Sequence, residues 1–206
     1  MNAQSPEMES AQPMVEEDQA RADFYALIAR LFYSGPDAGL LAAIAGADEI
    51  AGGDAPLAAA WSALSSAAAA MDVEAAREEY DRVFAGTGKA EITLYASHYL
   101  AENIQERVLV RLRDELSAMG LAKNRSVGEY EDHFSGLCEV MRHLIATGSG
   151  DVAVQEQKKF FIGYLNTWYP EIYAAVMASP NTNFYKQVAA FTKAFLDVEA
   201  GSFEMI

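Results

Sequence analysis

Apolar side chains recur every three or four residues in one segment of this chain after another, and this spacing limits what the chain can fold into. Near the N-terminus, five of them, Phe24, Leu27, Ile28, Leu31 and Phe32, share one face of a helix. No segment shows the sustained two-residue alternation, rich in β-branched side chains, that is typical of a strand. A continuous heptad pattern is also absent, which excludes a coiled coil. The sequence therefore predicts an all-α fold, a single globular helical domain of roughly eight to ten helices.

Capping and helix-ending residues predict where the helices lie. Residues 1–14 are polar and contain prolines, so we expect a disordered or loosely attached tail before an all-helical domain over 15–206. Asp37, Asp54 and Asp72 stand where N-caps are expected, and Gly120 is a typical helix stop. In the second half we predict helices over 97–119, 130–146, 151–169, 171–178 and 184–199, with Asp151 as a cap and Pro170 as a break.

One stretch, residues 79–100, interrupts the helical pattern. An amphipathic run stops at Gly86-Thr87-Gly88, and a short apolar segment precedes the return of helical spacing. Two glycines this close allow a positive φ or a close approach of another chain segment. Tyr95 and Tyr99 lie four residues apart and would share one face of a helix. Because loops on helical scaffolds often carry binding sites, we expect a functional site here.

The charge of the chain excludes several classes of partner. The 206 residues carry a formal net charge of -15, and the pI is about 4.5. An acidic surface repels phosphates, which argues against nucleic acid or an anionic membrane as the main partner. No apolar run reaches the length of a membrane-spanning helix, and the N-terminus lacks the features of a secretory signal. We therefore expect a cytoplasmic protein without stable membrane insertion.

Two patterns in the sequence partly resemble nucleotide-binding or metal-binding sites. Gly86-Thr87-Gly88-Lys89 differs from a phosphate-binding loop, because its first glycine position and its final Ser/Thr position hold other residues. Two Glu/His pairs, Glu129 with His133 and Glu139 with His143, are each spaced four apart, which suits two ligands on one helix face. The Glu-x-x-His motif of di-metal carboxylate bundles does not occur, however. A helix cap at Asp132 or Glu129, with His133 held by a carboxylate, explains the pattern more simply.

No catalytic constellation stands out. Cys138, the single cysteine, falls on an apolar helix face, where a thiol is usually inert packing. Ser97 and His98 are sequence neighbours, which is no evidence for a catalytic pair. The aromatic run over 160–170 is typical of a core, although part of it could line a groove for an apolar peptide.

Three motifs together resemble those of a known family. The first is Glu79-Tyr80 through Phe84-x-Gly86-x-Gly88, followed by Tyr95-x-Ser97-x-Tyr99. The second is Glu129-Tyr130-Glu131-Asp132-His133, and the third runs from Phe161 through Leu165-x-x-Trp168-x-Pro170. In order and separation they resemble the motifs of the TorD/DmsD family of cytoplasmic chaperones for molybdoenzymes, the redox-enzyme maturation proteins. The resemblance covers roughly residues 20–200.

The chain departs from the family pattern at two positions. Tyr130 stands where the family usually has proline, and Tyr164 where it often has histidine. Both departures indicate a divergent branch and bear on the identity of the client rather than on the fold.

The resemblance implies a client-specific chaperone without catalysis, cofactor or metal. Such a protein would bind the twin-arginine signal peptide, the body of an apo-molybdoenzyme, or both, and would delay export until the cofactor is inserted. An acidic surface and an aromatic groove would complement a peptide with a cationic front and an apolar stretch. Asp132 would pair with a peptide arginine. The implied binding residues are Glu129, Asp132, His133, Phe84, Gly86, Gly88, Tyr95, Ser97, Tyr99 and Trp168.

Two other functions remain open at this point. One is a metal-carboxylate helical-bundle enzyme built on Glu129, His133, Glu139 and His143, and the other is a helical adaptor without a peptide groove. The sequence is compatible with a monomer or a homodimer.

Overall fold

The computed structural model describes residues 16–50, 54–86, 89–100, 105–121 and 128–206. Within these ranges the chain forms ten α-helices and one π-helix, and the only β feature is an isolated bridge. The predicted all-α fold is confirmed, whereas the predicted tail over 1–14 lies outside the described residues. The helices are α1 Glu16–Tyr33, α2 Ala38–Ala45, α3 Ala55–Ala70, α4 Val73–Tyr80, η1 Asp81–Ala85, α5 Ala96–Tyr99, α6 Gln105–Ala118, α7 Phe134–Thr147, α8 Gly150–Tyr164, α9 Tyr169–Ala178 and α10 Phe184–Glu204.

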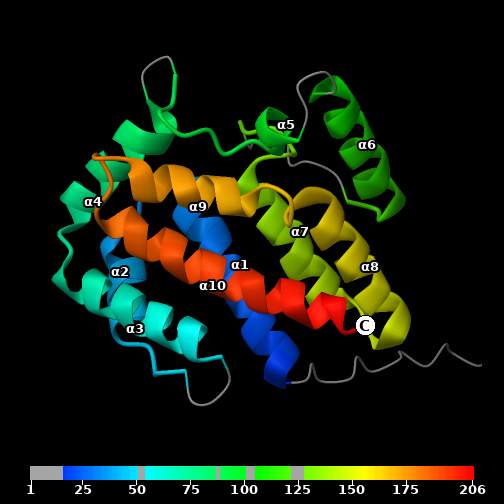
Figure 1. Cartoon of the computed structure of the whole chain (residues 1–206), viewed down its shortest axis with the longest axis horizontal. Helices are drawn as coiled ribbons and strands as arrows, with labels where there is room; N and C mark the ends of the chain where they lie inside the picture. Colours follow the sequence, from blue (N-terminus) through cyan, green and yellow to red (C-terminus); the bar gives the residue numbers. More distant parts are fainter. Residues whose placement is uncertain (1–15, 51–53, 87–88, 101–104, 122–127) are drawn as a thin grey trace, which may run out of the picture.

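Two long helices, α1 and α10, organise the packing. The α1 helix packs against α7, while α10 packs against α3 and α9 and crosses the middle of the molecule (Figure 1). The Phe32 ring lies at the centre and makes edge-on contacts with three other aromatic rings, those of Phe84, Phe134 and Tyr185. Burial of side chains of this size is the main source of stability in a domain of this kind. None of the described helices is long and apolar enough to cross a membrane.

The predicted aspartate caps are confirmed at three helices. The carboxylates of Asp37, Asp54 and Asp72 accept hydrogen bonds from the backbone N–H groups three residues later, at 2.8, 2.9 and 3.0 Å. Gly120 follows α6 with a φ of 72° and ends the helix as expected. These ends are set by local residues, which is why the sequence predicts them.

Five predictions of helix boundaries or caps are wrong. The helix predicted over 130–146 begins at Phe134, because His133 and not Asp132 or Glu129 is its N-cap. The long helix predicted over 97–119 is present as α5 and α6, and residues 101–104 between them lie outside the described residues. Pro170 stands in the first turn of α9 instead of ending α8, and Ser149 rather than Asp151 is the N-cap of α8. Pro170 is tolerated in the first turn of α9 because the N–H groups of a helix's first turn have no partner within the helix. The last helix continues to Glu204, five residues beyond the prediction.

A buried carboxylate from α4 caps α10 from a distance in the sequence. Glu79 is 6% exposed, and it accepts hydrogen bonds from the backbone N–H groups of Asn183, Phe184 and Tyr185 at 2.8, 3.1 and 2.8 Å. These are donors that a helix leaves without partners at its N-terminus. Glu79 therefore ties the first sequence motif to the C-terminal helix.

Candidate functional site

The first and second sequence motifs meet at one junction, formed by residues 94–97 and 132–134. The Ala96 N–H donates to the Asp132 carbonyl at 3.0 Å, and the Phe134 N–H donates to the Leu94 carbonyl at 2.8 Å. The isolated antiparallel bridge of Tyr95 and His133 lies between these two bonds. The structure thus places the Asp132–His133 pair next to the stretch over 79–100, at the start of α7.

Asp132 is part of the interior of this junction. It is 1% exposed, and its Oδ2 accepts a hydrogen bond from the backbone N–H of Ser97 at 2.9 Å. Its Oδ1 is buried without a hydrogen-bond partner among the residues that the structure describes. A carboxylate in this position holds the two segments together and does not face solvent. The expected direct contact between Asp132 and a peptide arginine does not fit this geometry.

His133 is a buried, neutral helix cap. Its Nδ1 accepts a hydrogen bond from the Ser135 N–H at 3.3 Å, so the ring proton stands on Nε2. The ring packs edge-on against Tyr95, with centroids 5.1 Å apart. Burial lowers the pKa of His133, although the nearby carboxylates of Glu129 and Asp132 act to raise it.

Glu129 lies beside this junction and is more open than Asp132. It is half-buried, and its Oε2 accepts the hydroxyl proton of Tyr95 in a short hydrogen bond. Burial and this bond raise the pKa of Tyr95, so the phenol stays protonated and remains a donor. No Lys, Arg or His side chain of the described residues forms an ion pair with Glu129.

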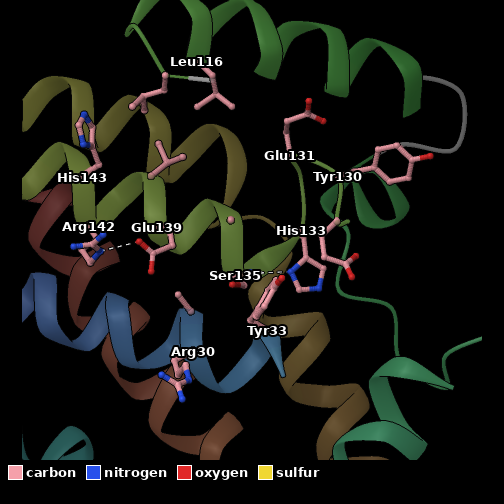
Figure 2. Close-up of a pocket in the computed structure, with 15 residues that line it drawn as sticks. Arg30, Tyr33, Leu116, Tyr130, Glu131, His133, Ser135, Glu139, Arg142 and His143 are labelled. Carbon is pink, nitrogen blue, oxygen red and sulfur yellow. Dashed lines mark hydrogen bonds and ion pairs between the residues drawn. The ribbon is translucent and has the colours of Figure 1, made fainter. Parts of the chain in front are cut away.

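Next to the junction, a groove of about 490 Å³ runs along α7 between α1 and the end of α6 (Figure 2). We call it the client groove, after the client-binding role that the sequence resemblance implies for Glu129 and His133, which line it. Its apolar lining includes Val140 of α7, Leu116 of α6 and Leu121. Two aromatic side chains, Tyr33 and Tyr130, also line it and are 46% and 59% exposed. Exposed aromatic residues around an apolar groove are typical of protein-binding surfaces.

Charged residues of the client groove are mostly paired. Arg142 donates to Glu139 on the same helix at 2.8 Å, as Figure 2 shows, and Arg113 donates to Glu131 at 2.9 Å. Arg30 of α1 forms a short ion pair with Asp37. These exposed pairs contribute little to stability but set the local charge along the groove.

Several residues predicted to contact a client instead form the core behind the junction. Trp168 is 0% exposed, donates its Nε1–H to the Tyr164 carbonyl at 2.6 Å and stacks on Tyr99 with centroids 5.1 Å apart. Phe84 is 8% exposed within the aromatic centre. Their expected direct contacts with a peptide do not fit this packing, which makes them supports of the site.

The backbone conformation explains why the first motif has glycine at position 86. Gly86 has a φ of 27°, and a Cβ at this position would lie 2.9 Å from the Lys89 carbonyl oxygen. Glycine is therefore required where the chain turns after η1. The second glycine, Gly88, lies outside the described residues.

The alternative metal site is not supported by the arrangement. Glu129, His133, Glu139 and His143 all line the client groove. Across the part of the chain that the structure describes, however, no three His, Cys, Asp or Glu side chains gather closely enough to hold a metal ion. Cys138 is fully buried on the apolar face of α7, and burial raises the pKa of its thiol.

Sequence reasoning missed the contribution of α1 to the groove. Arg30 and Tyr33 lie near the end of α1 and face α7, which is more than 100 residues later in the chain. One signal was present: Tyr33 is a large aromatic residue at the end of a helix and outside its apolar stripe. Only the packing of α1 on α7 shows that it borders the same groove as His133.

Comparison with known families identifies the class of protein. Residues 51–174 match the family model described as nitrate reductase delta subunit. This match covers more than half of the chain, and the chain belongs to that family. The members are chaperones of molybdoenzyme maturation, which confirms the resemblance to the TorD type. Comparison with curated proteins gave no match.

Proposed function

We propose that this protein is a cytoplasmic, client-specific chaperone that binds the twin-arginine signal peptide of an apo-molybdoenzyme in the client groove, and also contacts the body of that enzyme. Bound in this way, the client is kept from export until its cofactor is inserted. The protein acts without catalysis, as a monomer or a homodimer. Membership of a family of molybdoenzyme maturation chaperones supports the coarse part of this proposal.

The observation that carries the proposal is the groove itself. It combines an apolar floor at Val140 and Leu116, two exposed tyrosines at its rim, and the Glu129 carboxylate at one end. A signal peptide with a cationic start and an apolar continuation has the complementary chemistry. Glu129 and His133 line this surface. The residues that support it from the interior are Asp132, Ser97, Tyr95, Tyr99, Phe84 and Trp168.

The test is a change at the groove floor. Val140→Asp places a charge where the apolar stretch of the peptide would lie, so we expect affinity for a synthetic twin-arginine signal peptide to fall by about tenfold or more. Val152→Asp is the matched control, since Val152 is 74% exposed on α8 and does not line the groove. Calorimetry on both variants, with circular dichroism to verify folding, measures the effect. Equal affinity of the two folded variants would show that the peptide binds elsewhere.

A further inference from the structure

The two ends of the client groove carry different charges. The groove follows α7, and the ten steps along the chain from His133 to His143 correspond to about 15 Å at 1.5 Å per residue. At the start of α7 the lining contains Glu129 and Glu131, and we call this part the carboxylate end. Two to three turns further along, the lining contains Arg142, which is paired with Glu139 (Figure 2), and also Arg30 of the neighbouring α1, and we call this part the arginine end.

Of the two carboxylates at the carboxylate end, Glu131 has a cationic partner, and Glu129 has none among the described residues. Glu131 is bound by Arg113, and Arg142 at the other end is bound by Glu139. Glu129 accepts a hydrogen bond from Tyr95 and forms no ion pair within the described ranges of the chain. A half-buried carboxylate in this state is a favourable site for a guanidinium group, because the pair forms where water is partly excluded.

From these charges we infer that the groove binds its peptide in a single direction, with a peptide arginine on Glu129 and the apolar stretch continuing over Val140 toward Arg142. This inference rests on the proposed function. In the opposite direction the peptide arginines would lie beside Arg30 and Arg142, which already occupy the carboxylates of Asp37 and Glu139, so those carboxylates are not free to bind them. Helical geometry gives the span of about 15 Å room for roughly three turns of a bound helix, so one apolar segment reaches from end to end.

Tyr95 is the positioning residue for this contact. Its hydroxyl holds Oε2 of Glu129, while Oε1 accepts no hydrogen bond from the described residues, and the Glu129 side chain lines the groove. The Tyr95 ring is itself fixed against His133, and the backbone on either side of it is bound to the Asp132 and Phe134 segment. The hydrogen-bonded geometry of the junction therefore determines where the peptide arginine binds.

A double-mutant cycle tests the direction. The probes are a synthetic twin-arginine signal peptide and the same peptide with both arginines changed to glutamine. Glu129→Gln keeps the shape and the acceptor for Tyr95 but removes the charge, so we expect about tenfold weaker binding of the arginine peptide and no change for the glutamine peptide. Glu139→Gln, at the other end of the groove, tests the reverse direction and should not weaken binding of the arginine peptide relative to the glutamine peptide. Glu156→Gln, at an exposed position of α8 outside the groove lining, is the matched control and should change neither affinity by more than about twofold.

Each outcome is decisive for one of the two proposals. Coupling of the arginines to Glu139 instead of Glu129 would show the reverse direction, and coupling to neither would show a groove without direction. Failure of the wild-type protein to bind either peptide in the groove would overturn the proposed function itself. As a second measurement, a photo-crosslinker placed before the peptide arginines should label residues 128–133, and one at the peptide's C-terminal end should label residues 139–143, with the labelled residues assigned by tandem mass spectrometry. Exchange of these two labels would overturn the inferred direction without any protein variant.

Discussion

The Asp132 side chain shows how a residue of a binding motif can act from the interior. Its Oδ2 holds the Ser97 amide, which fixes the segment carrying Tyr95 against the start of α7. We expect Asp132→Ala to lower the free energy of unfolding by about 1–3 kcal/mol, because the partly buried Ser97 N–H loses its acceptor. Asp132→Asn retains an acceptor oxygen and should cost less. Urea denaturation of the two variants measures the difference, and equal losses would exclude this hydrogen bond as the cause.

A second residue-scale prediction concerns pH. Burial holds the pKa of His133 below its ordinary value of about 6.5, although the facing carboxylates of Glu129 and Asp132 act to raise it, and the Tyr95 ring packs against the imidazole. As pH falls, the unfolded chain therefore binds this proton first. The contribution of His133 to stability is complete above about pH 6.5 and is lost as pH falls from there through the folded-state pKa.

The measurement is the urea midpoint at about pH 7.5 and about pH 5.5, a window chosen above the range in which ordinary carboxylates titrate. We expect the wild-type protein to lose more stability over this interval than His133→Asn, whose shorter side chain still provides an N-cap acceptor. His98→Asn removes an exposed imidazole and serves as the control. An identical pH dependence of the wild-type protein and His133→Asn would exclude His133 as the titrating group.

At the scale of helices, a single long-range cap is expected to matter more than any local one. Glu79 accepts three backbone N–H groups at the start of α10, a helix of 21 residues that contacts α1, α3, α4, α8 and α9. Glu79→Gln removes the charge and one acceptor, so we expect a loss of about 1–3 kcal/mol and faster hydrogen exchange at Phe184 and Tyr185. Glu78→Gln, at the exposed neighbouring position, should be close to neutral. Similar exchange rates in the two variants would show that the Glu79 contact is dispensable.

The sequence predicts those helix ends that depend on neighbouring residues. Asp37, Asp54 and Asp72 cap the helices that follow them because a short side chain reaches an amide three residues later in any context. The errors arise where a distant segment decides. Residues 130–132 satisfy their backbone groups partly through the segment at Leu94–Ala96, which removes them from the predicted helix. The capping of α10 by Glu79 likewise depends on a contact across more than 100 residues.

At the scale of the whole molecule, the site is assembled from segments that lie far apart in the sequence. The motifs identify the junction of Tyr95 with His133, but the groove beside it also needs Tyr33 from α1 and Leu116 from α6. The motifs also mix two kinds of residue, because Trp168 and Phe84 are buried supports and Glu129 lines the surface. Periodicity alone cannot separate these roles, since both kinds of residue recur at the same helical spacing.

The final prediction concerns the net charge of -15, which acts on a cationic peptide before any contact forms. Raising the ionic strength from about 0.05 to about 0.5 M shortens the screening length, so we expect the association rate of a twin-arginine peptide to fall by about three- to tenfold. Apolar contacts in the groove are not screened, so binding should weaken without being lost. Glu129→Gln removes one of 30 acidic residues and should leave this salt dependence nearly unchanged, while the dissociation rate increases because the local pair is missing. Stopped-flow fluorescence on both proteins separates the two rates. An association rate that is independent of salt would mean that the acidic surface serves solubility alone.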